Sequence, residues 1–439
     1  MRYLAAGIFL IFYHFHLNAQ VFYRNWNCYT ISNIRSGSDA NNADFTAGTF
    51  SNTIVTGSTV SLAVAATTGT FTSRTFDIFQ SCIQFTAFQN FSWKTSLPFL
   101  KELPLTTENS TDYPSVLGTL QTNLIGYWRL NETTTGTAPG AKDFKDLSGN
   151  NNHATKTGTI TLGATGLFLS GASSNNTAGY FDLTGVNTLI GNTSSYTMSL
   201  WFNLSTFTNG CGGAGTYLFD RAISGGGNPL AGICTKGSSY GFESRCDNGT
   251  SLQQVLGGAV VLNKWQNVVI QRDRAAALYR IFTDGVQVNT AADGGGCTVT
   301  LDPPRVGRHA TGTNQGMTGT VDEIMIWNRA LTAAEVAQVY RRGGNRLRFQ
   351  FRACSKSDCS DNPTFVGPDG TASTYFSELY NNSVQSTGLG NVLTGSPAMT
   401  FSNFVSFSLT RNRYFQYRAY LDSNSTTTTP DFNYTALNW

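Results

Sequence analysis

The sequence predicts an all-β protein built of antiparallel sandwiches. Composition is the first reason: glycine, serine, threonine and asparagine are abundant, 13% of the 439 residues are aromatic and only 13% are charged. Aromatic strands joined by polar turns give extracellular sandwiches this composition. The second reason is that apolar residues recur with a period of two in several segments. The third is that helical periodicity is confined to residues 331–341.

The N-terminus has the pattern of a secretory signal peptide. Arg2 precedes an apolar run at residues 4–12, and residues 17–19 offer a cleavage site before Gln20. That run is too short to cross a bilayer, and no later stretch approaches the ~18 apolar residues of a transmembrane helix. We therefore expect residues 1–19 to be removed and the mature chain to be secreted or held at the cell-envelope surface, with no transmembrane segment.

The charge balance argues against one class of partner. With 29 basic and 26 acidic residues, the formal net charge is +3. A chain so close to neutral has no electrostatic basis for binding nucleic acid or an anionic membrane.

Eight cysteines predict disulfides rather than zinc. They form three groups of even size in a chain expected in an oxidising compartment, and no C-x-x-C motif occurs. Once the signal peptide is removed, only His153 and His309 remain, and each is predicted to be a turn residue rather than a ligand or a base.

The three cysteine groups predict pairing within modules. Four polar residues separate Cys354 from Cys359, which favours the local bridge Cys354–Cys359. The first group predicts Cys28–Cys82. The four inner cysteines allow three connectivities, of which we prefer Cys211–Cys297 with Cys234–Cys246.

Strand patterns begin near residue 44. Residues 69–77 read G-T-F-T-S-R-T-F-D, and an aromatic run at 82–93 ends in F-S-W. Residues 99–121 contain Pro104 and Pro114 with little periodicity, so this segment is predicted to be a linker.

The middle of the chain alternates most clearly. Residues 196–204 place five apolar side chains on one face, and residues 265–272 and 278–282 are predicted strands. Asp284-Gly285 predicts the hairpin turn that follows them.

The segment 318–340 predicts a strand followed by a short helix. Strict alternation puts Asp322 on the face of Ile324 and Ile326, so its carboxylate is expected to point inward. Thr332 and Glu335 have the spacing of a capping box, and Gly343-Gly344 is expected to end the helix.

Motifs at the two ends of this region carry a family resemblance. Residues 319–336 read G-T-V-D-E-I-M-I-W-N-R-A-L-T-A-A-E-V, and residues 124–153 include L-I-G-Y-W-R-L-N-E and D-L-S-G-N-N-N-H. They resemble the end and the beginning of a laminin G-like, concanavalin A-like domain. The resemblance implies an antiparallel jelly-roll sandwich at residues 122–343.

The outer segments resemble a second family. Residues 347–353 and 414–420 share the pattern F-Q-aromatic-R-A, and residues 367–371 read G-P-D-G-T. Together with residues 69–93 they resemble bacterial surface β-sandwich domains. The resemblance implies one sandwich composed of residues 20–115 and 346–439, with the jelly roll inserted between them. The alternative is three modules in a row, in which the N-terminal piece would have to close its own core.

The jelly-roll resemblance also nominates a calcium site. Some family members bind calcium through acidic and amide oxygens near the matching strand and loop, which by position implies Asp146, Asn150 and Asp322. In the alternative, Asp146 and Ser148 form an Asx-turn and Asn150 holds a left-handed bend.

Tryptophans and loops are the candidates for ligand recognition. The tryptophans at 128, 201, 265 and 327 have the chemistry to stack on sugars, but each lies at a strand position where core packing is the ordinary explanation. Loops rich in glycine and asparagine at 209–215, 225–228 and 294–296 are better candidates for a binding rim.

The sequence lacks the catalytic motifs of this fold. It has neither the E-x-D-x-x-E pair of laminarinase-like hydrolases nor G-x-S-x-G or H-E-x-x-H. We therefore predict an exported, non-catalytic binding or adhesion protein that recognises glycan or protein ligands through the jelly roll. The alternatives are a structural surface spacer and a divergent glycosidase.

Overall fold

The computed structural model describes residues 36–78, 90–104, 108, 110, 113–175, 179–186, 194–211, 215–222, 229–244, 253–294, 303–309, 315–379, 398–400 and 412–438. Within them the fold is all-β, as the sequence predicts. The chain divides into two compact units. We call Met1–Thr95 with Leu347–Trp439 the host unit, and Ser96–Arg346 the jelly-roll unit.

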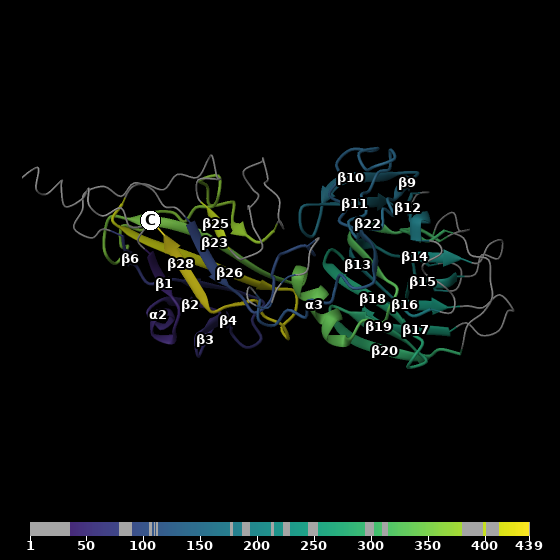
Figure 1. The fold of residues 1–439 in the computed structure, drawn as a ribbon, viewed down its shortest axis with the longest axis horizontal. Helices are drawn as coiled ribbons and strands as arrows, with labels where there is room; N and C mark the ends of the chain where they lie inside the picture. The colour runs from purple at the N-terminus through teal and green to yellow at the C-terminus, as the bar shows by residue number, and fades with distance from the viewer. Residues whose placement is uncertain are drawn as a thin grey trace, which may run out of the picture. The chain divides into compact units, whose positions relative to one another are not determined.

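Strands from the two ends of the chain share the sheets of the host unit (Figure 1). One sheet has the order β1 (Ser36–Asp39), β28 (Tyr434–Asn438), β7 (Asn90–Lys94), β25 (Ala398–Thr400). Another has the order β2 (Thr49–Ser51), β5 (Thr68–Thr72), β26 (Tyr414–Ser423), β23 (Asn345–Cys354), β24 (Phe376–Ser377), and β6 (Phe76–Asp77) also pairs with β26. The third has the order β27 (Asp431–Phe432), β4 (Thr59–Leu62), β3 (Thr53–Thr56), and a short helix, α2 (Asn42–Thr46), follows β1.

These pairings bury aromatic rings from both ends in one core. Strand β28 lies between β1 and β7, and β26 pairs with β5. The ring centroid of Phe91 lies 5.2 Å from that of Phe349 and 4.9 Å from that of Phe351. Phe71 and Phe432 pack at 5.8 Å. Each end of the chain therefore covers the apolar strand faces of the other.

Two sheets face each other in the jelly-roll unit. The first has the order β10 (Ile160–Thr165), β11 (Ser170–Asn175), β22 (Thr318–Trp327), β13 (Tyr196–Thr206), β18 (Trp265–Asp273), β19 (Leu278–Thr283), β20 (Val286–Ala292), and β8 (Leu124–Trp128) also pairs with β22. The second has the order β17 (Gln253–Ala259), β16 (Ser239–Ser244), β15 (Pro229–Lys236), β14 (Tyr217–Ala222), β21 (Arg305–Val306), β12 (Tyr180–Asp182), β9 (Thr155–Thr157), with a 3-10 turn, η1 (Thr184–Val186), after β12.

The core between these sheets follows the predicted alternation of β13. Its inward face carries five fully buried apolar side chains, Tyr196, Met198, Leu200, Phe202 and Leu204. Phe219, Ile233 and Phe242 meet them from the second sheet. The alternation predicted for residues 196–204 is confirmed.

A β-bulge breaks the predicted alternation in β22. Ser199 pairs with Met325, whereas Trp201, two residues further along β13, pairs with Asp322. Strand β22 therefore holds one extra residue at this point, and Glu323 adopts a left-handed φ of 52°. A bulge of this kind shifts every preceding side chain to the opposite face.

The bulge corrects the predicted orientation of Asp322. Val321 joins Ile324 and Ile326 in the core between the sheets. Asp322 is paired with Trp201, which packs outside the core, and directly opposed residues of an antiparallel pair share a face. The prediction that Asp322 shares the face of Ile324 and Ile326 is therefore wrong.

The outer face of the first sheet is covered by α3 (Ala333–Gly344). The predicted capping box begins this helix, with Thr332 and Glu335 bonded to each other reciprocally. The helix does not stop before the two glycines, and β23 starts at Asn345 without a linker. A Cβ on Gly343 would lie 2.5 Å from the Leu167 side chain, so the close approach of the helix to its neighbours requires glycine here.

The described part of residues 96–121 covers the same outer face and is not a linker. Leu103 and Leu120 are buried in one cluster with Met325, Trp327 and Val336. Because the first sheet is apolar on both faces, it needs this second cover. The jelly-roll unit therefore begins at residue 96 rather than 122, and the first part of the host unit ends at residue 95 rather than 115.

Candidate binding face of the jelly roll

The outer face of the second sheet carries a row of polar side chains. Five of them, Gln254, Glu243, Asp220, Arg305 and Asp182, follow one another in that order across the sheet. Gly232 of β15 separates Glu243 from Asp220. With Gly232 included, each residue is paired directly with the next, and opposed residues share a face. The residues that alternate with them, such as Phe242 and Val306, point into the core. We call these five residues the polar row.

Hydrogen bonds fix one end of the polar row. Tyr217 donates its hydroxyl to Glu243 Oε2 at 2.8 Å, and Gln254 Nε2 donates to Glu243 Oε1 at 2.8 Å. Lys236 Nζ in turn donates to Gln254 Oε1 at 2.7 Å. The Glu243 side chain is fully buried. Both of its oxygens are therefore held as hydrogen-bond acceptors.

His309 joins the middle of the row. Its ring centroid lies 4.5 Å from that of Tyr217, and its Nε2 lies 3.9 Å from Asp220 Oδ2. His309 and Asp220 are both buried. The prediction that His309 is only a turn residue missed this contact, because the sequence does not show which carboxylate faces the imidazole.

The other end of the row is half-buried and carries an aromatic ring. The Arg305 guanidinium lies 4.8 Å from the centre of the Tyr180 ring. Asp182 accepts a hydrogen bond from the Thr184 backbone N–H at 2.9 Å. A charged fork, a carboxylate and an aromatic ring lie together here, which suits a ligand with hydroxyl groups and one apolar face.

A disulfide borders the polar row and corrects two predicted pairings. Cys211 is joined to Cys234, with their Cα atoms 5.4 Å apart. Gly210 N–H donates to Thr235 O at 2.9 Å, which brings the start of the 209–215 loop beside β15. The predicted bridges Cys211–Cys297 and Cys234–Cys246 are therefore wrong, because both need a sulfur that this bridge uses.

The other cysteines divide into two cases. Cys354 and Cys359 are joined, with a Cα separation of 5.2 Å, as their spacing predicts. The predicted pair Cys28–Cys82 lies outside the described residues, as do Cys246 and Cys297.

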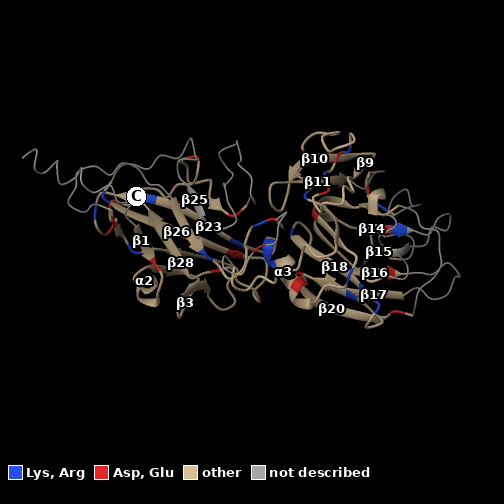
Figure 2. Ribbon diagram, viewed as in Figure 1, with Lys and Arg blue, Asp and Glu red and all other residues tan. Residues whose placement is uncertain are grey.

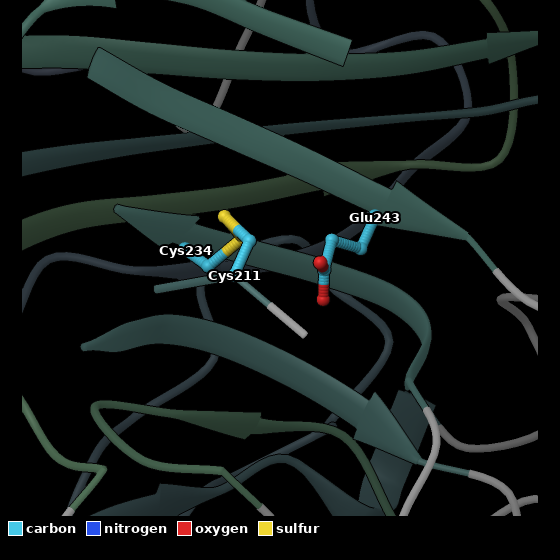
Figure 3. Close-up of side chains that lie close together, drawn as sticks. All are labelled: Cys211, Cys234 and Glu243. Atoms are coloured by element: carbon cyan, nitrogen blue, oxygen red, sulfur yellow. A yellow bond between two sulfur atoms is a disulfide. The ribbon is translucent and has the colours of Figure 1, made fainter. Parts of the chain in front are cut away.

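The disulfide also includes two members of the single cluster of potential metal ligands in the described part of the chain. Among its His, Cys, Asp and Glu side chains, Cys211, Cys234 and Glu243 bring their ligand atoms within 4.8 Å of one another (Figure 3). Metals bind the thiolate form of cysteine, and both sulfurs here are bonded to each other. The cluster is therefore not a metal centre.

Only part of the predicted rim can be placed. Residues 209–211 lie beside β15, where Asn209 Oδ1 accepts the Gly237 backbone N–H. Residues 225–228 lie outside the described residues, as do 295–296 of the third loop.

The four tryptophans are structural, as the core interpretation predicts. Trp128 and Trp327 are fully buried and donate their indole N–H to backbone carbonyls at 3.0 and 2.6 Å. Trp201 stacks on Tyr340 with 5.6 Å between centroids. Trp265 is partly buried against the same cluster. None of them lies on the second sheet.

Asp146, the first predicted calcium ligand, holds turn hydrogen bonds. Its Oδ1 accepts the backbone N–H of Tyr127 and of Ser148, both at 2.9 Å. Its Oδ2 accepts Ser148 Oγ and the Asn152 N–H, both at 2.8 Å. Asn150 donates its side-chain N–H to a backbone carbonyl at 3.0 Å. These are the bonds of the Asx-turn alternative. The left-handed bend that this alternative assigned to Asn150 lies instead at its neighbours Gly149 and Asn151.

Asp322 has a separate set of partners. Its Oδ2 accepts the N–H of Leu167 at 2.8 Å and of Phe168 at 3.4 Å, and its Oδ1 accepts the N–H of Glu323 at 2.9 Å. Burial raises the pKa of Asp322 well above its ordinary value, against the effect of these N–H donors.

The predicted calcium ligands do not fit a shared ion. Asp146 and Asp322 have no partner in common, and the groups that face their oxygens are hydrogen-bond donors. Such donors occupy the positions that a cation would need. The hydrogen bonds of Asp146, Asn150 and Asp322 therefore favour the turn alternative.

A buried charged cluster beside Asp322 was not predicted. Arg129 pairs with Glu102 at 2.9 Å, and Tyr127 donates its hydroxyl to Glu323 at 2.8 Å. Burial raises the pKa of Glu323 well above its ordinary value, and the carboxylates of Glu102 and Asp322 raise it further. This cluster fastens residues 96–104 to the sandwich. It depends on the bulge at Glu323, which alternation alone does not reveal.

The jelly-roll unit is thus an antiparallel sandwich with one polar, partly aromatic outer face. Residues 152–337 match the family model described as the concanavalin A-like lectin/glucanases superfamily. The predicted resemblance is thereby confirmed for the matched residues. None of the curated proteins matches the chain in sequence.

Solved structures of low identity resemble about half of the chain. Domain 4 of AbnA, a GH43 extracellular arabinanase from Geobacillus stearothermophilus, is 17% identical over 50% of this chain and 98% of its own, with a TM-score of 0.38. The binding domain of Paraclostridial Mosquitocidal Protein 1 is 16% identical over 54% of this chain and 62% of its own, with a TM-score of 0.39. The receptor binding domain of botulinum neurotoxin C/D mosaic serotype is 14% identical over 50% and 51%, with a TM-score of 0.38. Likenesses this distant carry no functional argument.

Proposed function

We propose that this chain is an exported, non-catalytic binding protein that recognises carbohydrate through the polar row on the second sheet of its jelly roll. The observation that carries the proposal is that this outer face brings the half-buried Arg305 guanidinium, the Asp182 carboxylate and the Tyr180 ring together at one end of the polar row. The outer face of the first sheet is covered by α3 and by the described part of residues 96–121. On the second sheet Asp220 and Glu243 are buried, so the half-buried residues Tyr180, Asp182 and Arg305 form the candidate surface. The match of residues 152–337 to the concanavalin A-like lectin/glucanases superfamily supports carbohydrate as the class of ligand.

A glycan fits this face better than a protein ligand. Hydroxyl-rich ligands need both donors and acceptors, which the directly paired Arg305 and Asp182 supply side by side. The face of the Tyr180 ring opposite Arg305 suits the apolar face of a pyranose. In the view of Figure 2, acidic and basic residues are interspersed over the described strands, which agrees with a ligand that is not nucleic acid.

Export is supported by the signal-like N-terminus and by disulfides. The bridges Cys211–Cys234 and Cys354–Cys359 suit an oxidising compartment. In the described part of the chain, no helix is long and apolar enough to cross a membrane.

A divergent glycosidase is the second candidate. Asp220 and Glu243 lie on the same face and pair with Gly232 from opposite sides, so two strand spacings of ~4.8 Å separate them. Glycosidases use two carboxylates at comparable separations. We favour binding because both Glu243 oxygens already accept hydrogen bonds from Tyr217 and Gln254.

A glycan array probed with the whole chain tests the proposal. We expect specific neutral oligosaccharides to bind, and Arg305→Gln to weaken that binding about tenfold, the loss of one charge-assisted hydrogen bond. The matched control is Arg280→Gln, which removes the same charge from the first sheet, where Arg280 pairs with Asp273. An array without a bound glycan would favour the spacer alternative. Release of reducing sugar from a bound polysaccharide, lost in Glu243→Gln, would favour the glycosidase.

A further inference from the structure

The host unit carries a second polar face, made by the repeated motif of the sequence. The segments F-Q-F-R-A at 349–353 and F-Q-Y-R-A at 415–419 fall on β23 and β26, which are neighbours in one sheet. The aromatic residues of both segments are fully buried. Because strand side chains alternate between faces, the other residues lie together on the opposite face. We call these four, Gln350, Arg352, Gln416 and Arg418, the glutamine–arginine face.

A loop is fastened across this face. Gln350 donates its side-chain N–H to the Thr374 carbonyl at 2.8 Å, and Arg352 Nη1 donates to Asn362 Oδ1 at 2.6 Å. The loop between these two anchors places Phe365 against the face. The cross-strand contact from Arg352 to Gln416 Oε1, at 2.7 Å, fixes the orientation of the guanidinium.

Phe365 brings two guanidinium groups together. The central carbon of Arg352 lies 4.4 Å from the centre of the Phe365 ring, and that of Arg418 lies 4.1 Å from it. Arg352 is 8% exposed. Over the residues that the structure describes, neither arginine forms an ion pair with a carboxylate. Asp361, the nearby acid, accepts hydrogen bonds from Ser355 instead.

Two like charges with neutral partners leave a positive potential at this face. Burial lowers the pKa of Arg352, and the charge of Arg418 lowers it further. Arg352 Nε and Nη2 both donate to Gln416 Oε1, and the Phe365 ring lies against both guanidinium groups. An anion would therefore lie beside the half-buried Arg418, where the charge of Arg352 also attracts it. Guanidinium N–H groups match the planar carboxylate in particular.

Aromatic rings extend the same face. The Tyr375 ring lies 5.0 Å from the Tyr420 ring, and the Arg348 guanidinium lies 4.4 Å from the Tyr375 ring. Arg348 is neutralised by Asp422. Both tyrosines are half-buried, so each keeps part of its surface open. Half-open aromatic rings beside a cationic pair suit a sugar ring that bears an acid group.

We propose that the glutamine–arginine face binds an acidic sugar residue, with its carboxylate beside Arg418 and its ring beside Tyr375 and Tyr420. This site lies in the host unit and does not depend on the neutral-glycan site proposed for the jelly roll. It gives the repeated F-Q-aromatic-R-A motif a role in recognition as well as in packing.

The test titrates the whole chain calorimetrically with an oligogalacturonate and with its methyl ester, which has the same ring and no charge. We expect the free acid to bind and the ester to bind at least about tenfold more weakly, the loss of a charge-assisted contact. Inorganic sulfate is the third arm, and we expect it to bind more weakly than the oligomer because it lacks the ring.

Single-residue variants test whether Arg418 contacts the oligogalacturonate. Arg418→Gln should weaken oligogalacturonate binding about tenfold or more. The control Arg413→Gln removes the same charge from the host unit at an exposed pair with Asp77, and should stay within about twofold of the unsubstituted chain. Unchanged melting temperatures establish that both variants fold. Equal affinity for acid and ester, equal affinity for sulfate and oligomer, or full affinity in Arg418→Gln would each overturn the proposal.

Discussion

The Glu335 carboxylate connects three parts of the jelly-roll unit. It pairs with Arg329 at 2.7 Å and accepts the Thr332 backbone N–H at 2.8 Å at the start of α3. It also accepts the Thr119 hydroxyl from the covering segment. Burial acts to raise the pKa of Glu335, but these hydrogen bonds outweigh it and lower the pKa from 4.5 to about 2.

That lowered pKa makes stability depend on pH in a defined direction. The folded value lies below the ordinary one, so the stabilisation is complete above pH 4.5 and is lost as the pH falls toward about 2. We predict that Glu335→Gln lowers the free energy of unfolding by on the order of 2 kcal/mol at pH 7. The difference should shrink as the pH falls through this window. Urea unfolding at several pH values measures it, and a difference that does not change with pH would contradict the assignment.

Gly241 allows the disulfide to lie on the second sheet. A Cβ at this position would lie 2.7 Å from Cys211 Sγ and 2.9 Å from the Leu256 side chain. We predict that Gly241→Ala destabilises the chain by about 1–3 kcal/mol, as overpacking does. The matched control is Gly294→Ala, where a Cβ meets nothing within 4 Å. Thermal unfolding compares the two, and equal effects would show that the contact is unimportant.

Asp146 and Asp322 lead to a prediction about calcium. Because their oxygens accept hydrogen bonds from separate donors, we expect a chelator to leave the melting temperature unchanged. A chelator-induced decrease that Asp322→Asn abolishes would instead restore the calcium site implied by the family resemblance.

At the scale of secondary-structure elements, the sequence correctly predicted the features that depend on residues close together in the chain. The alternation of β13, the capping box at Thr332 and Glu335, and the Cys354–Cys359 bridge all rest on contacts close in the chain. The bulge at Glu323 was missed because a single extra residue leaves the hydrophobic pattern nearly unchanged.

The polar row could not be predicted from the sequence, for a different reason. Its members come from strands that span residues 180–259 and 305–306, so the row exists only once the register of the strands is known. The sequence held one partial indication of this face. Gly232 and Gly241 alternate with apolar residues that point into the core, so the outer face carries no side chain at these two positions. The covering role of the described part of residues 96–121 was hidden because its apolar residues follow no regular period.

The corrected boundary gives a prediction for this covering segment. A fragment of residues 96–346 should fold with a higher melting temperature than a fragment of 122–343. The shorter one lacks Leu103 and Leu120 and so exposes Met325 and Trp327 on the first sheet. Equal melting temperatures would return residues 96–121 to the role of a linker.

At the scale of the whole molecule, the shared sheets of the host unit predict how the chain divides. Because β28 lies between β1 and β7, we expect residues 20–95 joined by a short linker to 347–439 to fold without the jelly-roll unit. Residues 21–115 alone should aggregate, since their aromatic strand edges are uncovered. A 21–115 fragment that melts cooperatively as a soluble monomer would support three modules in a row.

The most direct test of the binding face is hydrogen exchange of the whole chain, with and without the neutral oligosaccharide that binds best on the array. If the polar row binds the ligand, amide exchange should slow at residues 217–222, 239–244 and 305–306, where Asp220, Glu243 and Arg305 lie. The first sheet and the host unit should stay unchanged. Protection confined to the first sheet or to the host unit, with the second sheet unaffected, would contradict the account.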